Sequence, residues 1–204
     1  MAHVFEEITE SLRQWIVRQP LFFVASAPLD ERGHVNVSPK GPIGSLAVLG
    51  PHRVAYLDVN GSGAETVAHL RENGRICVMF CAFDGPPRIV RLHGTGEPVL
   101  KDDPRFGALM ADAGFQDPSI PEARRSVVVV DVERVSDSCG YGVPLMRLEG
   151  HRDHHAVASA KRLRTAGSPE AYDAAQRTRG ARSLDGLPAL EPPAVARLPI
   201  SQGD

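Results

Sequence analysis

The sequence has little net charge, no long apolar run and few lysines. Lysine and arginine together number 23, against 25 aspartates and glutamates, which gives a net charge of −2. A general nucleic-acid-binding protein would carry a basic excess, so this balance argues against that class. No apolar stretch approaches the ~18 residues that a membrane-spanning helix needs, so we expect no membrane segment.

Cysteine is also scarce, with three residues in the chain. The first ten residues lack the basic start and apolar core of a signal peptide, so we expect reduced thiols and a cytoplasmic location. Cys77 and Cys81 lie about 13 Å apart if they share one strand, too far for a disulfide or a common metal. We expect both to be core residues, and Cys139 to be buried in a turn.

Glycine and proline, by contrast, are plentiful at 19 and 17 residues. Such punctuation is typical of short strands joined by turns. Length and composition predict a β-rich domain over residues 1–149. A C-terminal extension over residues 150–204 is expected to hold helices over 154–165 and 169–179, and then a proline-rich tail whose last dozen residues are mobile.

Apolar runs cut by turns predict about six antiparallel strands in the first domain. The runs cover residues 21–27, 34–38, 43–49, 53–59, 76–83, 88–96 and 126–135. Helical spacing of apolar residues predicts helices over 4–18, 65–73 and 104–113, and Gly74 is a natural helix end. In the run 88–96, Val90 and Leu92 alternate with Arg91 and His93, and a strand with such a polar face usually meets a ligand or partner.

Three histidines near the start of the extension form the one candidate metal cluster. His151, His154 and His155 have the spacing of one helix face. No cysteine accompanies them, and the nearest acids are Glu149 and Asp153. We therefore interpret this segment as a solvated helix start and expect no metal site.

The most informative segment lies between His34 and Asn73. One predicted strand leads into Lys40, and another ends at Asp58. A Gly-Ser-Gly turn then precedes a predicted helix, whose free N–H groups and positive dipole end favour a phosphate. Ser62 and Thr66 would add hydroxyl donors. The alternative is an ordinary helix start capped by either hydroxyl. The turn is not a nucleotide-hydrolase P-loop, because the Gly-Lys-Ser/Thr ending is missing.

Several segments in this order resemble the pyridoxamine 5′-phosphate oxidase-like FMN-binding split-barrel superfamily. They are residues 34–41, 55–66, 69–75, 79–83, 91–94, 138–144 and 182–188. The last two are similar to a branch distinct from the true oxidase. The resemblance implies a mainly β fold with flanking helices, built on a six-stranded antiparallel split β-barrel. It also implies a homodimer with two FMN sites in the subunit interface.

The resemblance further implies roles for individual residues. Asn36, Val37 and Ser38 would line the isoalloxazine edge, and Lys40 would lie near the flavin or its phosphate. Leu57 and Asp58 would flank the ring and the ribityl chain, and Ser62, Glu65 and Thr66 would face the phosphate. Arg91 would approach from a neighbouring strand, with Arg88 as a second candidate, and residues 139–141 would lie near the interface.

The implied activity is that of an FMN-dependent oxidoreductase, which passes hydride or electrons between the flavin and a small substrate or nicotinamide reductant. Two departures argue against vitamin B6 oxidation. The true oxidase has Arg-Lys where Glu65-Thr66 stands, and its arginine-rich C-terminal signature is missing. Tyr56, Tyr141 and His93 are candidate proton donors, but no catalytic residue is assigned. A non-catalytic flavin-binding dimer for sensing, storage or stress remains an alternative, as does a relative that binds deazaflavin or haem.

Overall fold

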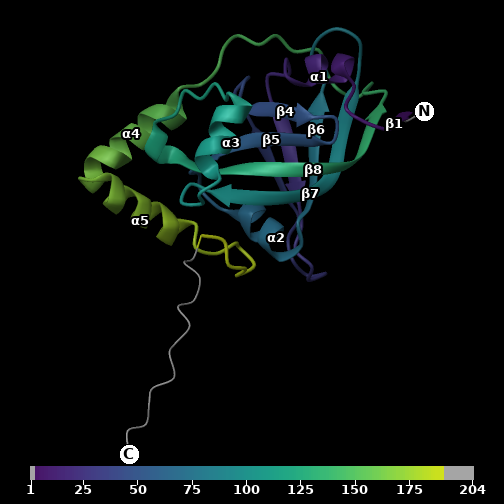
Figure 1. Ribbon diagram of the computed structural model, residues 1–204. Helices are drawn as coiled ribbons and strands as arrows, with labels where there is room; N and C mark the ends of the chain where they lie inside the picture. Colours follow the sequence, from purple (N-terminus) through teal and green to yellow (C-terminus); the bar gives the residue numbers. More distant parts are fainter. Residues whose placement is uncertain (1–2, 191–204) are drawn as a thin grey trace, which may run out of the picture.

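Antiparallel strands form the centre of the protein, as expected. The computed structural model describes residues 3–190, and eight strands of this part form one sheet (Figure 1). They are β1 (His3–Phe5), β2 (Phe22–Ser26), β3 (Asn36–Lys40), β4 (Leu46–Gly50), β5 (Arg53–Val59), β6 (Arg75–Cys81), β7 (Ile89–Leu100) and β8 (Arg124–Ser138). Their order is β3-β2-β6-β7-β8-β5-β4, and β1 pairs with β8. The described sheet thus has more strands than the six predicted, and its hydrogen-bonded path leaves β3 and β4 at opposite ends.

The predicted helix over residues 4–18 is wrong in its first half. Residues 3–5 form β1, in which Phe5 pairs with Val135. Helix α1 covers only Glu10–Ile16, because the Thr9 side chain accepts a hydrogen bond from Leu12 N–H and so sets the start of the helix. The spacing of Phe5 and Ile8 suits one helix face, but pairing with β8 overrides it.

The concave face of the sheet encloses the main core. Alternate residues of five strands are buried there, including Val24, Val54, Val78, Val90 and Val128. Helix α1 adds Leu12 and Ile16 from one side. The same alternation on β7 confirms that Val90 and Leu92 face one side of the sheet, here the buried side, and Arg91 and His93 the other.

Helix α2 (Glu65–Asn73) lies across another part of the sheet, in contact with β2, β6 and β7. It ends where predicted, at Gly74, whose φ of 72° is the left-handed conformation that glycine adopts without strain. The next helix along the chain, α3 (Phe106–Ala113), corresponds to the predicted helix 104–113. It covers the outer face of β4, β5 and β8.

The extension packs onto this sheet rather than leaving it. The short 3₁₀ helix η1 (Pro121–Ala123) precedes β8, and helices α4 (His154–Ala166) and α5 (Pro169–Arg179) agree with the predicted pair. Figure 1 shows α4 and α5 at one side of the sheet and the following segment beneath α2. The predicted mobile tail lies outside the described residues, and the predicted boundary at residue 149 falls in the irregular segment between β8 and α4.

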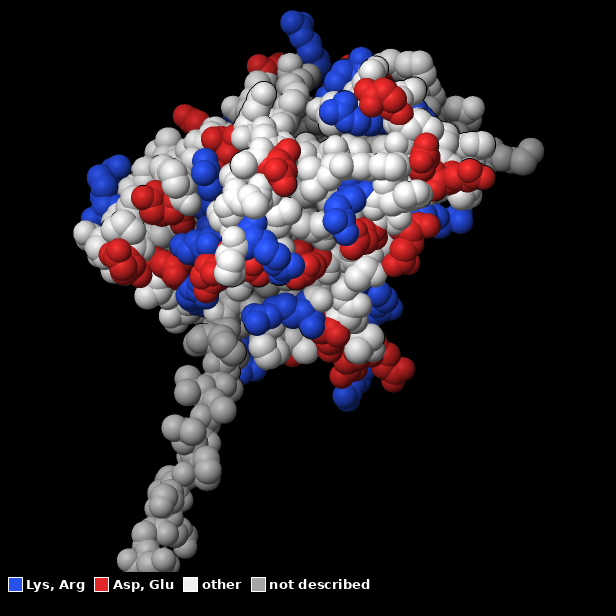
Figure 2. Space-filling model, in the orientation of Figure 1, with Lys and Arg blue, Asp and Glu red and all other residues white. Residues whose placement is uncertain are grey.

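Charges of both signs are mixed over the face in Figure 2, in keeping with the near-neutral net charge. In the part of the chain that the structure describes, no helix is long and apolar enough to cross a membrane.

Candidate functional site

Strand β3 presents three of the predicted site residues on one face. Asn36, Ser38 and Lys40 pair across the sheet with Ser26, Val24 and Phe22 of β2, and these partners are buried on the core side. Because side chains alternate along a strand, the three polar residues face the same way. Their assignment to a flavin site, which the family resemblance implies, stays a prediction.

Asn36 is the centre of a hydrogen-bonded network between β3 and α2. Its amide donates to Thr66 Oγ1 at 3.0 Å and to Ser26 Oγ at 3.3 Å, and its oxygen accepts from Ser38 Oγ at 3.0 Å. Ser26 Oγ in turn contacts Nδ1 of His69, a fully buried side chain, at 3.0 Å. The network joins two segments that the sequence analysis singled out separately, the strand 34–38 and the start of the helix 65–73.

A second cluster joins the two ends of the sheet through charge. Lys40 of β3 donates to Asp58 Oδ1 on β5 at 2.7 Å, and Arg125 Nε of β8 donates to Asp58 Oδ2 at 2.6 Å. Arg125 also donates through Nη1 to the Gly63 carbonyl at 2.7 Å. We call Lys40, Asp58 and Arg125 the inner triad. It connects β3, at one end of the pairing order, with β5 near the other end, and within residues 3–190 these two strands do not pair through their main chains.

The inner triad is buried to an unusual degree for three charges. Asp58 is 2% exposed and Arg125 is 8% exposed, while the Lys40 side chain is 21% exposed. Burial alone would raise the pKa of Asp58, but the charges and hydrogen bonds of Arg125 and Lys40 hold that pKa well below its usual range. Asp58 is therefore ionised, and the triad carries a net charge of about +1 at neutral pH.

The start of α2 differs from the capped helix that was the alternative prediction. The N-cap is Ala64, and no side chain caps the helix, so neither Ser62 nor Thr66 acts as its cap. Ser62 is exposed, and Thr66 is buried and bonded to Asn36. The first N–H groups of α2 therefore have no capping side chain, although Ala64, Thr66 and Val67 themselves are buried.

Glu65 is engaged by the C-terminal part of the chain. Both of its carboxylate oxygens accept from Leu184 N–H, at 3.1 and 3.2 Å. Leu184 belongs to a segment, residues 180–190, that we call the strap. The strap buries Leu190 and Ala189 against α2, and Asp185 accepts hydrogen bonds from the N–H and ring of His34. Glu65 thus holds the strap.

Besides Ser62 and Glu65, four predicted residues do not join the two clusters within one chain. Val37 is 60% exposed on the opposite face of β3, and Arg91 lies on the outer face of β7, where Nη1 donates to Ser138 Oγ at 3.2 Å. Leu57 packs beneath α3 in the outer cluster. Arg88 pairs with Asp137 and lies over the rings of Phe5 and Trp15.

Arg125 is the residue that sequence reasoning missed. It stands directly before the apolar run of the last strand, and a charged residue there is typical of an exposed strand end. Its contact with Asp58 depends on the register of β5 and β8, which shifts between Asp58 and Val59. A signal was available, because Asp58 ends a buried strand and needs a cation, but nothing in the sequence favoured Arg125 over the other arginines.

The candidate proton donors lie apart from one another. Tyr56 is fully buried, and burial followed by the charge of Asp58 raises its pKa well above the ordinary value, against an opposing effect of Arg125. Tyr141 is 83% exposed in the segment after β8. His93 is on the outer face of β7, where burial and then Arg134 and Arg91 lower its pKa.

The cysteines and histidines lead to one correction. Cys139 is exposed, not buried, because the chain leaves the sheet directly after Ser138. Cys81 is buried and Cys77 is half-buried, and all three thiols are free. His155 Nε2 donates to the Asn60 carbonyl at 2.7 Å, and the described residues contain no group of three or more side chains placed to hold a metal ion.

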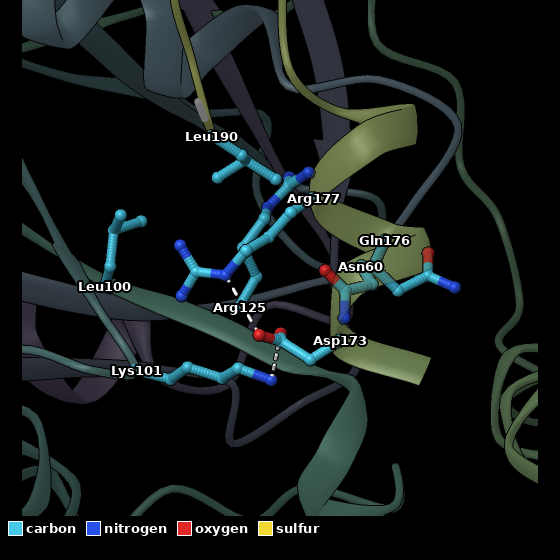
Figure 3. Close-up of a pocket in the computed structure, with 8 residues that line it drawn as sticks. All are labelled: Asn60, Leu100, Lys101, Arg125, Asp173, Gln176, Arg177 and Leu190. Atoms are coloured by element: carbon cyan, nitrogen blue, oxygen red, sulfur yellow. Dashed lines mark hydrogen bonds and ion pairs between the residues drawn. The ribbon is translucent and has the colours of Figure 1, made fainter. Parts of the chain in front are cut away.

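A small cavity lies behind Arg125, between the sheet and α5 (Figure 3). Its volume is about 10 Å³, the space of one water molecule. Asp173 of α5 lies there between Lys101 and Arg177 and pairs with both. Gln176 of α5 and Leu190 of the strap also line the cavity from the side of the extension. The cavity is thus too small for a cofactor.

Comparisons with known proteins place these features in a family. Residues 8–139 match the family model described as pyridoxamine 5′-phosphate oxidase. The chain is 45% identical over 198 residues to the pyridoxamine 5′-phosphate oxidase family protein ustO of Aspergillus flavus, covering 91% of this chain and 77% of that protein.

Two solved structures have lower similarity. The H111A variant of HupZ from Group A Streptococcus has a TM-score of 0.49 and 24% identity, over 64% of this chain and 99% of that chain. The FAD binding protein from Mycobacterium smegmatis has a TM-score of 0.44 and 12% identity, over 66% and 97%. The two sequence matches are sufficient by themselves: this chain belongs to the pyridoxamine 5′-phosphate oxidase family, as a member distinct from the true oxidase.

Proposed function

We propose that this protein binds FMN and acts as an oxidoreductase on a small substrate. The observation that carries the proposal is the chain of contacts that links Lys40, through Asp58 and Arg125, to the turn before the uncapped start of α2. Lys40 and Arg125 share Asp58, and Arg125 also bonds the Gly63 carbonyl in the turn before the helix. A phosphate at this place would meet a net positive triad, the exposed Ser62 and the positive end of a helix that no side chain caps.

The residues present fit a phosphate-bearing cofactor in charge and donor type. Lys40 keeps two N–H donors beyond its bond to Asp58, since an ammonium has three. Glu65 would oppose a phosphate, but its carboxylate is hydrogen-bonded to Leu184 N–H of the strap. Asn36 and Ser38 offer polar groups for the ring end of the same ligand. When bound, the flavin supplies the hydride or electron chemistry, and these residues hold and orient it.

The test of cofactor binding is direct. The purified protein is examined for flavin absorbance and titrated with FMN while quenching of flavin fluorescence is followed. Saturable binding of one FMN per chain supports the proposal. If the protein carries no flavin and cannot be reconstituted with FMN, the proposal is wrong. The same titration with a deazaflavin and with haem separates the two other ligands that the family resemblance leaves open.

We also propose that two copies associate through the outer face of β2, β6 and β7. Phe23, Ala25, Cys77 and Met79 lie on this face and are half-buried in one chain, and Arg91 is beside Met79. An apolar face of this kind is typical of a subunit interface. Sedimentation should show a dimer, and Met79→Glu should shift it toward monomer. A wild-type monomer at all concentrations would contradict the proposal.

One observation favours a non-catalytic flavin-binding protein as the second candidate. None of the three candidate proton donors is both exposed and part of the two clusters. Tyr56 lies under Lys40 but is fully buried, while Tyr141 and His93 are elsewhere. Reduction of the bound flavin by NADH or NADPH, followed by reoxidation in air, separates the candidates. Turnover above that of free FMN favours the oxidoreductase, and turnover equal to free FMN favours the binding protein.

A further inference from the structure

We propose that Arg125 is a positioning residue that holds both halves of the candidate phosphate site in register. Through Asp58 it fixes the ammonium of Lys40, and through the Gly63 carbonyl it fixes the turn before α2. The identity of the anion rests on the proposed function, whereas the positioning of Lys40 does not.

Two N–H donors of Arg125 bind different partners. Nε donates to Asp58 Oδ2 at 2.6 Å, and Nη1 donates to the Gly63 carbonyl at 2.7 Å. A guanidinium is planar and rigid, so these two contacts fix the carboxylate and the turn relative to each other. The second oxygen of Asp58 then receives Lys40 Nζ at 2.7 Å, and Ser126 Oγ contributes a longer contact of 3.4 Å to Oδ2. Lys40 therefore depends on Arg125 through a single carboxylate.

The surroundings keep Arg125 in this position. The side chain is 8% exposed, and the cavity behind it has room for about one water molecule. Leu190 of the strap and Gln176 of α5, which are 4% and 5% exposed, form part of the cavity wall (Figure 3). The guanidinium has no space in which to swing away from Asp58, so the extension supports the triad from behind.

Stability alone does not explain the arrangement. Removing three charges from water carries a desolvation penalty that can exceed their mutual attraction, and apolar residues of similar volume often serve a core equally well. The inner triad also keeps an excess of one positive charge. Such an excess is expected where a charged group has to be held at a defined point for an anion.

The test compares Arg125→Gln and Arg125→Lys with the control Arg53→Gln. Arg53 pairs with Asp131 on the same two strands at the same 2.6 Å Nε–Oδ distance, but its side chain is 56% exposed. The chain contains three lysines, Lys40, Lys101 and Lys161, so protein labelled at lysine shows three side-chain NMR signals that can be followed without any flavin. Affinity for FMN and for inorganic phosphate is measured on the same samples.

In Arg125→Gln we expect the Lys40 signal to move and sharpen, and FMN affinity to fall about tenfold or more. Arg125→Lys keeps a charge for Asp58 but loses the fork to Gly63, so it should restore the Lys40 signal and recover only part of the affinity. Arg53→Gln should change neither. If Arg125→Gln does not fold, Arg125→Met, which fills a similar volume without a charge, takes its place, and the same movement of the Lys40 signal is expected.

An unchanged Lys40 signal in the uncharged Arg125 variant overturns the positioning role. In Arg125→Gln, an affinity that falls while the Lys40 signal stays unchanged also overturns it, because Arg125 would then contact the anion itself. If the wild-type protein binds no FMN, the proposed function fails, yet the lysine signals still decide whether Arg125 positions Lys40.

Discussion

Two charged triads in this protein have opposite composition and opposite surroundings. The inner triad sets one acid between two cations, Lys40 and Arg125, and is almost wholly buried. The outer triad sets one cation, Arg105, between Glu97 and Asp103, and all three are more exposed, with Arg105 at 55%. Their shortest contacts are nearly equal, at 2.6 and 2.7 Å.

The comparison shows that the length of an ion pair does not by itself determine how much the pair contributes to stability. In the outer triad, water screens each charge and can replace any partner that is removed. In the inner triad, removal of a partner leaves a charge without water or counter-charge. Only the inner triad is therefore expected to tie the positions of separate strands together.

The largest expected effect is that of Asp58→Asn. It leaves Lys40 and Arg125 facing each other without a counter-charge in a buried place, so we expect a loss of about 3–5 kcal/mol in the free energy of unfolding. Urea denaturation followed by circular dichroism measures the loss. The control is Asp103→Asn in the outer triad, and equal losses in the two variants would remove the distinction between the triads.

The pH dependence of stability provides a second test of the contribution of the inner triad. The pKa of Asp58 is lower in the folded protein than its ordinary value near ~3.9, so its stabilising effect is full at neutral pH and is lost as the pH falls below about 4. The stability difference between wild type and Asp58→Asn should narrow over this range. Urea midpoints measured between about pH 7 and pH 3 test this, and a constant difference would contradict it.

A smaller effect is expected in the neutral network beside the inner triad. Thr66→Val keeps the shape of the side chain but removes the acceptor of Asn36 Nδ2. We expect a loss of about 1 kcal/mol in the free energy of unfolding, since Asn36 keeps its longer bond to Ser26. Urea denaturation provides the measurement. A loss as large as that of Asp58→Asn would show that burial matters more than charge.

The smallest effect is expected for Arg105→Gln. Its two acids remain in water, so the urea midpoint should not change measurably at moderate salt. A clear destabilisation would show that the outer triad also stabilises the fold. The two triads would then not differ in the way proposed.

Local patterns predicted most strands and four of the five helices, since alternation and helical spacing need only neighbouring residues. They failed at residues 4–9, where a long-range pairing with β8 outweighs local spacing. The candidate site was predicted in part. Asn36, Ser38 and Thr66 do come together, and so do Lys40 and Asp58.

The rest of the site depends on contacts between distant segments. The pairing of Asp58 with Arg125 spans 67 residues and depends on a register shift between β5 and β8. The bond between Glu65 and Leu184 spans 119 residues and depends on how the extension turns back over α2. A single sequence carries no periodic signal for either contact.

The strap has a consequence for where this protein can be cut. The family match ends at residue 139, yet Ala64, Val67 and Ala68 of α2 are covered by Ala189 and Leu190. A fragment trimmed to the matched segment would expose that apolar surface and free the carboxylate of Glu65. The smallest piece that keeps α2 covered is therefore longer than the piece that defines the family, and expression fragments, fusions and tags should leave residue 190 in place.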